Sequence, residues 1–285
     1  MRWSPRARNP NLEDRRGSSG GMGGALPKMG IGGFVVLLLL SFVFKRDFFA
    51  LVGGGGAPQG APAGQEVPVS ASPEETQLVE FVNSLLYDTE ETWGRIFAAS
   101  GKTYQPPQLV LFRNAVRSGC GTAESSVGPF YCPADGKVYI DLSFYEELRG
   151  RFGADGDFAQ AYVIAHEIGH HVQNLLGISD EVRQAQQQDP GSANDLSVRL
   201  ELQADCFAGV WANGTEQSKK FIEPGDVEEA MGAAAAVGDD RIQQQSTGQV
   251  NPESWTHGSS QDRMRWFQAG LQSGDLKSCD TFAAR

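Results

Sequence analysis

The stretch Asp157-Phe-Ala-Gln-Ala-Tyr-Val-Ile-Ala-His-Glu-Ile-Gly-His-His-Val-Gln-Asn-Leu-Leu-Gly177 decides the fold, because it predicts one largely buried helix that carries a metal-binding pattern. Its first residue is a predicted N-cap, its last is a predicted C-terminal stop, and no proline interrupts it. Positions i and i+4 share a helix face, so His166 and His170 can hold one ion while Glu167 stands beside it. In this spacing two imidazoles bind Zn²⁺ and the glutamate acts as general base. His171 is turned about 100° from His170 and is predicted to pack or to support the site, without binding the ion.

A zinc site that hydrolyses a substrate usually has three protein ligands and an open position for water. A third histidine in the extended form of the motif is excluded, because Gln173 and Leu176 stand where glycine and histidine would be. The remaining histidine, His257, could serve in principle, but a carboxylate further along the chain is better placed.

A second helix is predicted over residues 192–214, and it carries Glu201 and Asp205 at positions i and i+4 in an otherwise apolar interior. Two carboxylates on one such face repel each other unless a cation faces them. We expect Glu201 to bind zinc and Asp205 to accept the free N–H of a ligand histidine, which orients the imidazole. The alternative is an ordinary solvated face, or an ion pair with Arg199 or Arg263.

Several segments together carry a resemblance to a known family. They are AHEIGHHVQ at 165–173, ELQADCFAG at 201–209, THGSS at 256–260, GPFYCP at 128–133 and VYID at 138–141. Two histidines followed by a glutamate on a second helix resemble the gluzincin metallopeptidases. More narrowly, the segments look like the bacterial family of putative neutral zinc metallopeptidases, over roughly residues 75–272. The resemblance implies an α+β, zincin-like domain that is mostly helical with a small antiparallel sheet. It also implies one catalytic Zn²⁺ and a peptide or protein substrate.

Two residues are predicted to act directly in catalysis. In the activity that the resemblance implies, zinc polarises a water molecule, and Glu167 takes its proton and passes it to the leaving amine. The tetrahedral oxyanion needs a donor besides zinc. We assign this role to His257, which precedes a glycine and a predicted helix cap at Ser259 or Ser260. The alternatives are that His257 is a surface or packing histidine and that Arg263, a weaker candidate, is the donor.

The rest of the catalytic domain is predicted to contain helices over residues 73–97 and 224–245 and strands over residues 109–112 and 137–142. Pro-Ala-Asp-Gly at residues 133–136 indicates a hairpin turn just before the second strand.

In zincin-like enzymes an edge strand beside the active helix binds the substrate backbone. Gly128, Phe130 and Tyr131 are predicted to take this substrate-binding role, because the proline among them is tolerated only at a sheet edge. The alternative is a surface hairpin stapled by a disulfide.

Four segments divide the chain. Residues 1–28 are predicted to be a basic cytoplasmic tail, and residues 29–52 a transmembrane anchor whose main apolar run is somewhat shorter than the ~20 residues that a spanning helix needs. Charged and aromatic residues occupy the place of a cleavage site, so a retained single-pass anchor is favoured over a signal peptide. Residues 53–72 are a Gly/Pro/Ala linker, and residues 73–285 are the zinc metallopeptidase domain. The basic N-terminal side predicts that this side is cytoplasmic and that the catalytic domain lies in the periplasm or otherwise outside the cytoplasm. The resemblance to a bacterial family implies that the membrane is a bacterial inner membrane.

The cysteines and the charge distribution agree with an oxidising compartment outside the cytoplasm. Cys120 and Cys132 bracket a short loop, and Cys206 with Cys279 is the preferred second pair, although four cysteines leave three pairings open. Residues 1–52 hold eight Lys/Arg and three Asp/Glu, a net charge of +5, and the remaining residues carry a net charge of −16. A domain this acidic is a poor nucleic-acid binder, so no nucleic-acid partner is expected.

These observations predict a membrane-anchored, zinc-dependent metalloendopeptidase. The alternative from another class is a zinc-binding envelope protein for interaction or assembly, without peptidase turnover. Glu167 argues against that alternative, because a structural zinc site usually has four protein ligands and needs no general base. A third interpretation is a hydrolase of a non-peptide amide.

Overall fold

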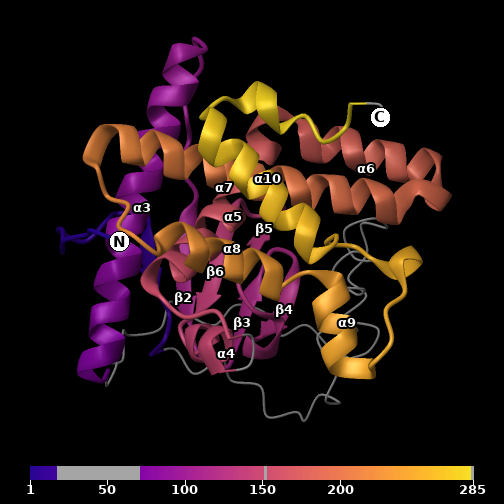
Figure 1. Ribbon diagram of the computed structural model, residues 1–285. Helices are drawn as coiled ribbons and strands as arrows, with labels where there is room; N and C mark the ends of the chain where they lie inside the picture. Colours follow the sequence, from indigo (N-terminus) through magenta and orange to yellow (C-terminus); the bar gives the residue numbers. More distant parts are fainter. Residues whose placement is uncertain (18–70, 151–152, 284–285) are drawn as a thin grey trace, which may run out of the picture.

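The computed structural model describes residues 1–17, 71–150 and 153–283, which form a mostly helical α+β fold (Figure 1). The helices are α3 (Pro73–Ala99), α4 (Phe144–Gly150), α5 (Asp157–Leu176), α6 (Ile178–Gln188), α7 (Ala193–Lys219), α8 (Asp226–Ala236), α9 (Asp239–Thr247) and α10 (Ser260–Ser273). The strands are β1 (Leu12–Asp14), β2 (Gln108–Phe112), β3 (Ala115–Ser118), β4 (Gly121–Glu124), β5 (Phe130–Cys132) and β6 (Lys137–Asp141). The α+β class and the helical majority are as predicted.

The main sheet has the strand order β1-β2-β6-β5 and is mixed. β1 pairs with β2 and β2 pairs with β6 in parallel, and only the hairpin of β5 and β6 is antiparallel. The prediction of a purely antiparallel sheet is therefore wrong for this sheet, because β2 reaches β6 through a long connection that contains the small antiparallel pair of β3 and β4. The two predicted strands and the predicted hairpin turn are confirmed.

The predicted helices are present but differ from the predictions at three places, and α4 and α6 were not predicted. α5 ends at Leu176 with Gly177 as its C-cap, at φ 83°, but its N-cap is Gly156, so Asp157 is the first helical residue and not the cap. α7 continues through Gly214 to Lys219, because Gly214 packs tightly against α3: a Cβ there would lie 2.8 Å from Thr92 Cγ2. The helix predicted over residues 224–245 is two helices, α8 and α9, separated around Gly238.

Close helix contacts set the geometry around α7, which lies between α5 and α10 (Figure 1). A Cβ at Gly169 of α5 would lie 2.9 Å from Ala204 O of α7. On the other side, a Cβ at Gly270 of α10 would lie 1.9 Å from Cys206 O, and one at Gly209 would lie 2.1 Å from Phe267 O. The three helices therefore approach through backbone-to-backbone contacts that only glycine permits.

Both disulfides connect the preferred cysteine pairs. Cys120–Cys132 joins the loop after β3 to the end of β5, and Cys206–Cys279 joins α7 to the C-terminal segment. The second bridge fixes the tail against α7 one residue after Asp205.

The N-terminal residues differ from the predicted separate tail. Residues 1–17 pack on the domain formed by residues 71–283, where β1 forms the parallel edge of the main sheet. The Met1 amino group lies 2.7 Å from Asp157 Oδ1 and 3.1 Å from Asp226 Oδ1, at the starts of α5 and α8. Among the described residues, no helix combines the length and the apolar character needed to cross a bilayer. The predicted anchor (residues 29–52) and linker (residues 53–72) lie outside the described residues, apart from residues 71 and 72.

Candidate metal centre

Helices α5 and α7 bring three ligand atoms together. His166 and His170 lie one turn apart on α5, and Glu201 faces them from α7. His166 Nε2 is 3.2 Å from Glu201 Oε2, and His170 Nε2 is 3.3 Å from Glu201 Oε1. Two ligand atoms that each lie about 2.0–2.1 Å from a tetrahedral zinc ion are about 3.3 Å apart. Both the spacing and the donor set of two imidazoles and one carboxylate therefore fit a catalytic zinc ion.

Two hydrogen bonds decide which histidine nitrogen faces the ion. His166 Nδ1 is 2.8 Å from Asp205 Oδ1, and His170 Nδ1 is 2.9 Å from Gln173 Oε1. Each Nδ1–H is the donor in these pairs, which leaves both Nε2 lone pairs directed towards the glutamate ligand. Gln173 is fully buried and also donates to a main-chain carbonyl of α7. Sequence reasoning gave Gln173 no role, although its i+3 spacing from His170 was a usable signal.

Asp205 is fully buried where α5, α7 and α10 meet. It accepts hydrogen bonds from His166, from the Tyr162 hydroxyl, and from Arg263 at 2.8 and 2.9 Å. Burial raises the pKa of Asp205, but the charges of Arg263 and His166 and their hydrogen bonds outweigh burial and lower it. Asp205 thus makes both the predicted histidine contact and the Arg263 ion pair that was its alternative, whereas Arg199 pairs with Asp195.

The centre favours positive charge. Burial lowers the pKa of His166, but the Asp205 charge and the hydrogen bonds to Asp205 and Glu201 outweigh it and raise the pKa to about 10. Burial likewise raises the pKa of Glu201, while the neighbouring histidines hold it well below its ordinary value. A site that stabilises an imidazolium so strongly also suits a divalent cation in its place.

Glu167 lies next to the ligands on α5 and is partly exposed. Burial raises its pKa, and the charges of His166 and His170 and a hydrogen bond from the Tyr131 main chain only partly oppose this. A raised pKa makes a glutamate a stronger base, which suits a group that accepts a proton and later returns it. Its place and its pKa therefore agree with the predicted general base.

His257 lies in the segment that crosses α7 beside Glu201. A Cβ at the following residue, Gly258, would lie 3.1 Å from Val198 Cγ1 and 3.3 Å from Leu202 Cδ2, which flank Glu201 on α7. The side chain is 28 % exposed, so it is neither a free surface group nor a core residue.

An aspartate holds His257 in place. His257 Nδ1 is 3.2 Å from Asp239 Oδ1, and Asp239 Oδ2 accepts from three successive main-chain N–H groups, at Thr256, His257 and Gly258. Burial lowers the pKa of His257, but the Asp239 hydrogen bond and the charges of Glu201 and Asp239 outweigh it and raise the pKa. Asp239 was not found from the sequence, because 18 residues separate it from His257.

The predicted substrate strand lies at the sheet edge beside α5, since β5 packs on that helix and pairs with β6. Phe130 is buried and stacks on Tyr139 in a second small core, so its side chain points away from the metal centre. The Tyr131 hydroxyl is 3.2 Å from His171 Nδ1, and Gly128 packs near the Phe144 ring. The prediction that this segment binds a peptide therefore rests on its main chain and not on its side chains.

His171 packs between α5 and two neighbouring segments, as predicted. Its Nε2 donates to Gln105 O at 2.7 Å, and the rings of Tyr104 and Tyr131 lie edge-on to it. Burial lowers its pKa, although the hydrogen bond to Gln105 opposes this, and the neutral imidazole is favoured. It braces β5 against α5 and takes no part in holding the ion.

A helix carrying His166, Glu167 and His170, faced by a glutamate on a second helix, defines the class of zinc metallopeptidases. The chain belongs to the family "Putative neutral zinc metallopeptidase", whose model matches residues 1–282. It is 52% identical over 290 residues to the uncharacterized protein YpfJ of Escherichia coli (strain K12), with 99% of each chain covered. It is also 51% identical over 191 residues to the uncharacterized protein Mb2605 of Mycobacterium bovis, with 64% of each chain covered. No solved structure matches the chain.

Proposed function

We propose that the protein hydrolyses peptide bonds with one catalytic zinc ion. The observation that carries the proposal is the convergence of His166, His170 and Glu201, whose ligand atoms lie within 4.8 Å of one another, with Glu167 at the adjoining position. A bound zinc ion would supply the Lewis acidity that lowers the pKa of water and polarises a carbonyl group.

Glu167 is the general base in this proposal. Its carboxylate accepts the proton of the attacking water and then delivers it to the leaving nitrogen. The partial burial that raises its pKa makes the protonated form accessible, so the same group serves both transfers.

His257 stabilises the developing oxyanion. Its Nδ1–H donates to Asp239, and the raised pKa favours the doubly protonated ring, in which Nε2–H is a second donor for the oxyanion. Asp239 is a positioning residue that acts through His257.

The substrate is an extended peptide or protein segment. Among the described residues, β5 pairs with β6 on one side and has no strand partner on the other, so its main chain can pair with an added strand. Two disulfides and the acidic catalytic domain favour an extracytoplasmic location at the bacterial inner membrane, which we propose together with contact between residues 29–52 and lipid.

Zinc content and hydrolysis of a peptide library by the full chain test the proposal. We expect Glu167→Gln to keep one equivalent of zinc and lose hydrolysis, and His170→Ala to lose zinc. Glu181→Gln is the matched control, because this exposed glutamate of α6 lies outside the site. A wild-type protein that binds zinc and cleaves no peptide would instead support the zinc-binding envelope protein without turnover. Normal hydrolysis by Glu167→Gln would remove the assignment of the base.

A further inference from the structure

The N-terminal segment, residues 1–17, is joined to the catalytic domain by main-chain hydrogen bonds along its length. Arg2 N–H donates to Phe221 O after α7, and Leu109 N–H of β2 donates to Asn11 O, both at 2.8 Å. Arg15 N–H donates to Leu111 O, also at 2.8 Å, which continues the parallel pairing of β1 with β2. Leu12–Asp14 therefore form a strand of the main sheet, and the main chain on either side of them is hydrogen-bonded to the domain.

Buried polar groups of α3 depend on this segment. Asn83 is 5% exposed, and its side chain accepts from Asn9 N–H at 2.8 Å and donates to the carbonyls of Arg6 and Ala7. Without the segment these amide groups would be left buried and unpaired, which is unfavourable. Leu12, at 5% exposure, fills part of the main core.

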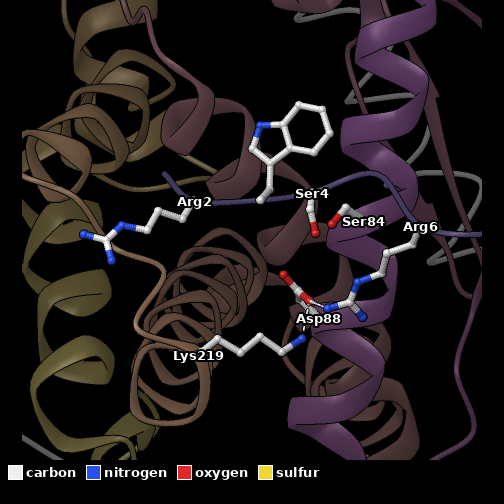
Figure 2. Close-up of a pocket in the computed structure, with 7 residues that line it drawn as sticks. Arg2, Ser4, Arg6, Ser84, Asp88 and Lys219 are labelled. Atoms are coloured by element: carbon white, nitrogen blue, oxygen red, sulfur yellow. Dashed lines mark hydrogen bonds and ion pairs between the residues drawn. The ribbon is translucent and has the colours of Figure 1, made fainter.

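The arginines of the segment pair with carboxylates of the domain. Figure 2 shows Arg6 and Lys219 converging on Asp88, and Arg6 lies 3.1 Å from Asp88 and 3.0 Å from Glu91. Arg2 lies 3.3 Å from Glu223. Arg2 and Arg6 were part of the sequence argument for a cytoplasmic tail. In the structure both arginines form ion pairs with the folded domain.

The chain leaves and re-enters the domain at one place. Arg16 Nη1, at the end of the N-terminal segment, is 2.8 Å from Glu75 Oε1 in the first turn of α3. Arg113, next to the end of β2, binds the same Glu75 carboxylate. The end of the N-terminal segment and the start of α3 are therefore close together in space, although the apolar run separates them in the sequence.

We infer that residues 1–17 and residues 71–283 occupy one compartment, so that the chain between them begins and ends on the same side of any membrane. A chain that leaves and returns to one folded body crosses a membrane an even number of times. Two helical crossings need about 40 apolar residues. Residues 29–52 supply about half of that and include Lys45, Arg46 and Asp47. The single-pass anchor predicted from the sequence is incompatible with this inference, which does not depend on the proposed peptidase activity.

Site-specific labelling of the full chain in spheroplasts tests the inference. All four native cysteines are in disulfides, so an added cysteine is the one reactive thiol. Arg8→Cys reports on the exposed part of the N-terminal segment, and Val250→Cys, at 43% exposure, reports on the catalytic domain. We expect a membrane-impermeant maleimide to label both variants to the same extent before permeabilisation. Labelling of Val250→Cys alone, with Arg8→Cys reacting only after permeabilisation, would overturn the inference.

A cross-link checks that the pairing of β1 with β2 exists in cells. Glu13 and Val110 are register partners, so their Cα atoms lie within the range that a disulfide spans. We expect Glu13→Cys with Val110→Cys to form an additional disulfide and to migrate faster on a non-reducing gel, whereas Arg8→Cys with Val110→Cys serves as the control that should not. If the variant retains zinc but forms no Glu13–Val110 disulfide, β1 does not pair with β2 in cells, and the inference of a shared compartment is refuted.

Discussion

The contact between α7 and α10 offers the sharpest test of how the site is held. In Gly270→Ala the new Cβ would lie 1.9 Å from Cys206 O and 2.9 Å from Val210 N. Ordinary contact begins at 3.4 Å, so α10 would have to move by about 1.5 Å or strain its backbone. Both atoms that it meets are main chain and cannot rotate away. We expect a loss of about 3 kcal/mol in the free energy of unfolding, at the upper end of overpacking costs.

The displacement should reach the metal centre as well. Gly270 and Arg263 are seven residues apart on one face of α10, and Arg263 holds Asp205 behind His166. Urea unfolding measures the stability loss, which corresponds to a fall in Tm of about 6–12 °C for a domain of this size. Zinc affinity, measured by competition with a chelator, should fall in the same variant.

Gly232→Ala is the matched control, because this glycine lies in α8 and a Cβ there would meet nothing within 4 Å. We expect it to raise stability by about 0.5–1 kcal/mol, since alanine restricts the unfolded chain and favours helix. If Gly270→Ala unfolds within about 0.5 kcal/mol of the wild type, overpacking costs do not apply here and the close-contact reasoning is wrong.

Three further outcomes are expected. Replacing both Cys206 and Cys279 by serine should lower the free energy of unfolding by about 4 kcal/mol, because that bridge closes a 73-residue loop. Replacing the pair that ends at Cys132, which closes a 12-residue loop, should lower it by about 3 kcal/mol. Equal losses in urea unfolding would contradict the loop-length argument. Asp239→Asn should lower the pKa of His257, so the alkaline limb of the pH profile of kcat should move to lower pH. The stability that the His257–Asp239 pair contributes is complete below the unfolded pKa of about 6.5 and is lost as pH rises through the raised folded pKa. An alkaline limb that does not move would count against the pair. Removing the metal with a chelator should lower the Tm, since an ion at 100 times its Kd stabilises by about 2.7 kcal/mol; an unchanged Tm would mean that no ion is bound.

The metal centre could be predicted from the sequence because local geometry dictates most of it. Helical periodicity alone places His166, Glu167 and His170 on adjoining positions, and the same rule pairs Glu201 with Asp205. The disulfide partners were preferred but not fixed, because spacing does not choose among pairings.

The remaining features depend on contacts between distant parts of the chain. The register partners of β1 and β2 are 97 positions apart in the sequence, and nothing in a three-residue strand signals this partner. Asp239 reaches His257 only because the chain turns back after α9. α7 passes Gly214 because packing on α3 outweighs the local preference of an Asn-Gly pair to end a helix.

One nine-residue interval of α7 has a consequence for how the chain can change over evolutionary time. Glu201 faces the ligand histidines, Asp205 faces Arg263, Cys206 holds the C-terminal segment, and Gly209 admits α10. A substitution alters one of these partners, but insertion or deletion of one residue rotates everything beyond it by about 100°. Each partner past that point would then face the wrong neighbour at once. Relatives that keep the metal centre should therefore vary in sequence within this interval and never in its length.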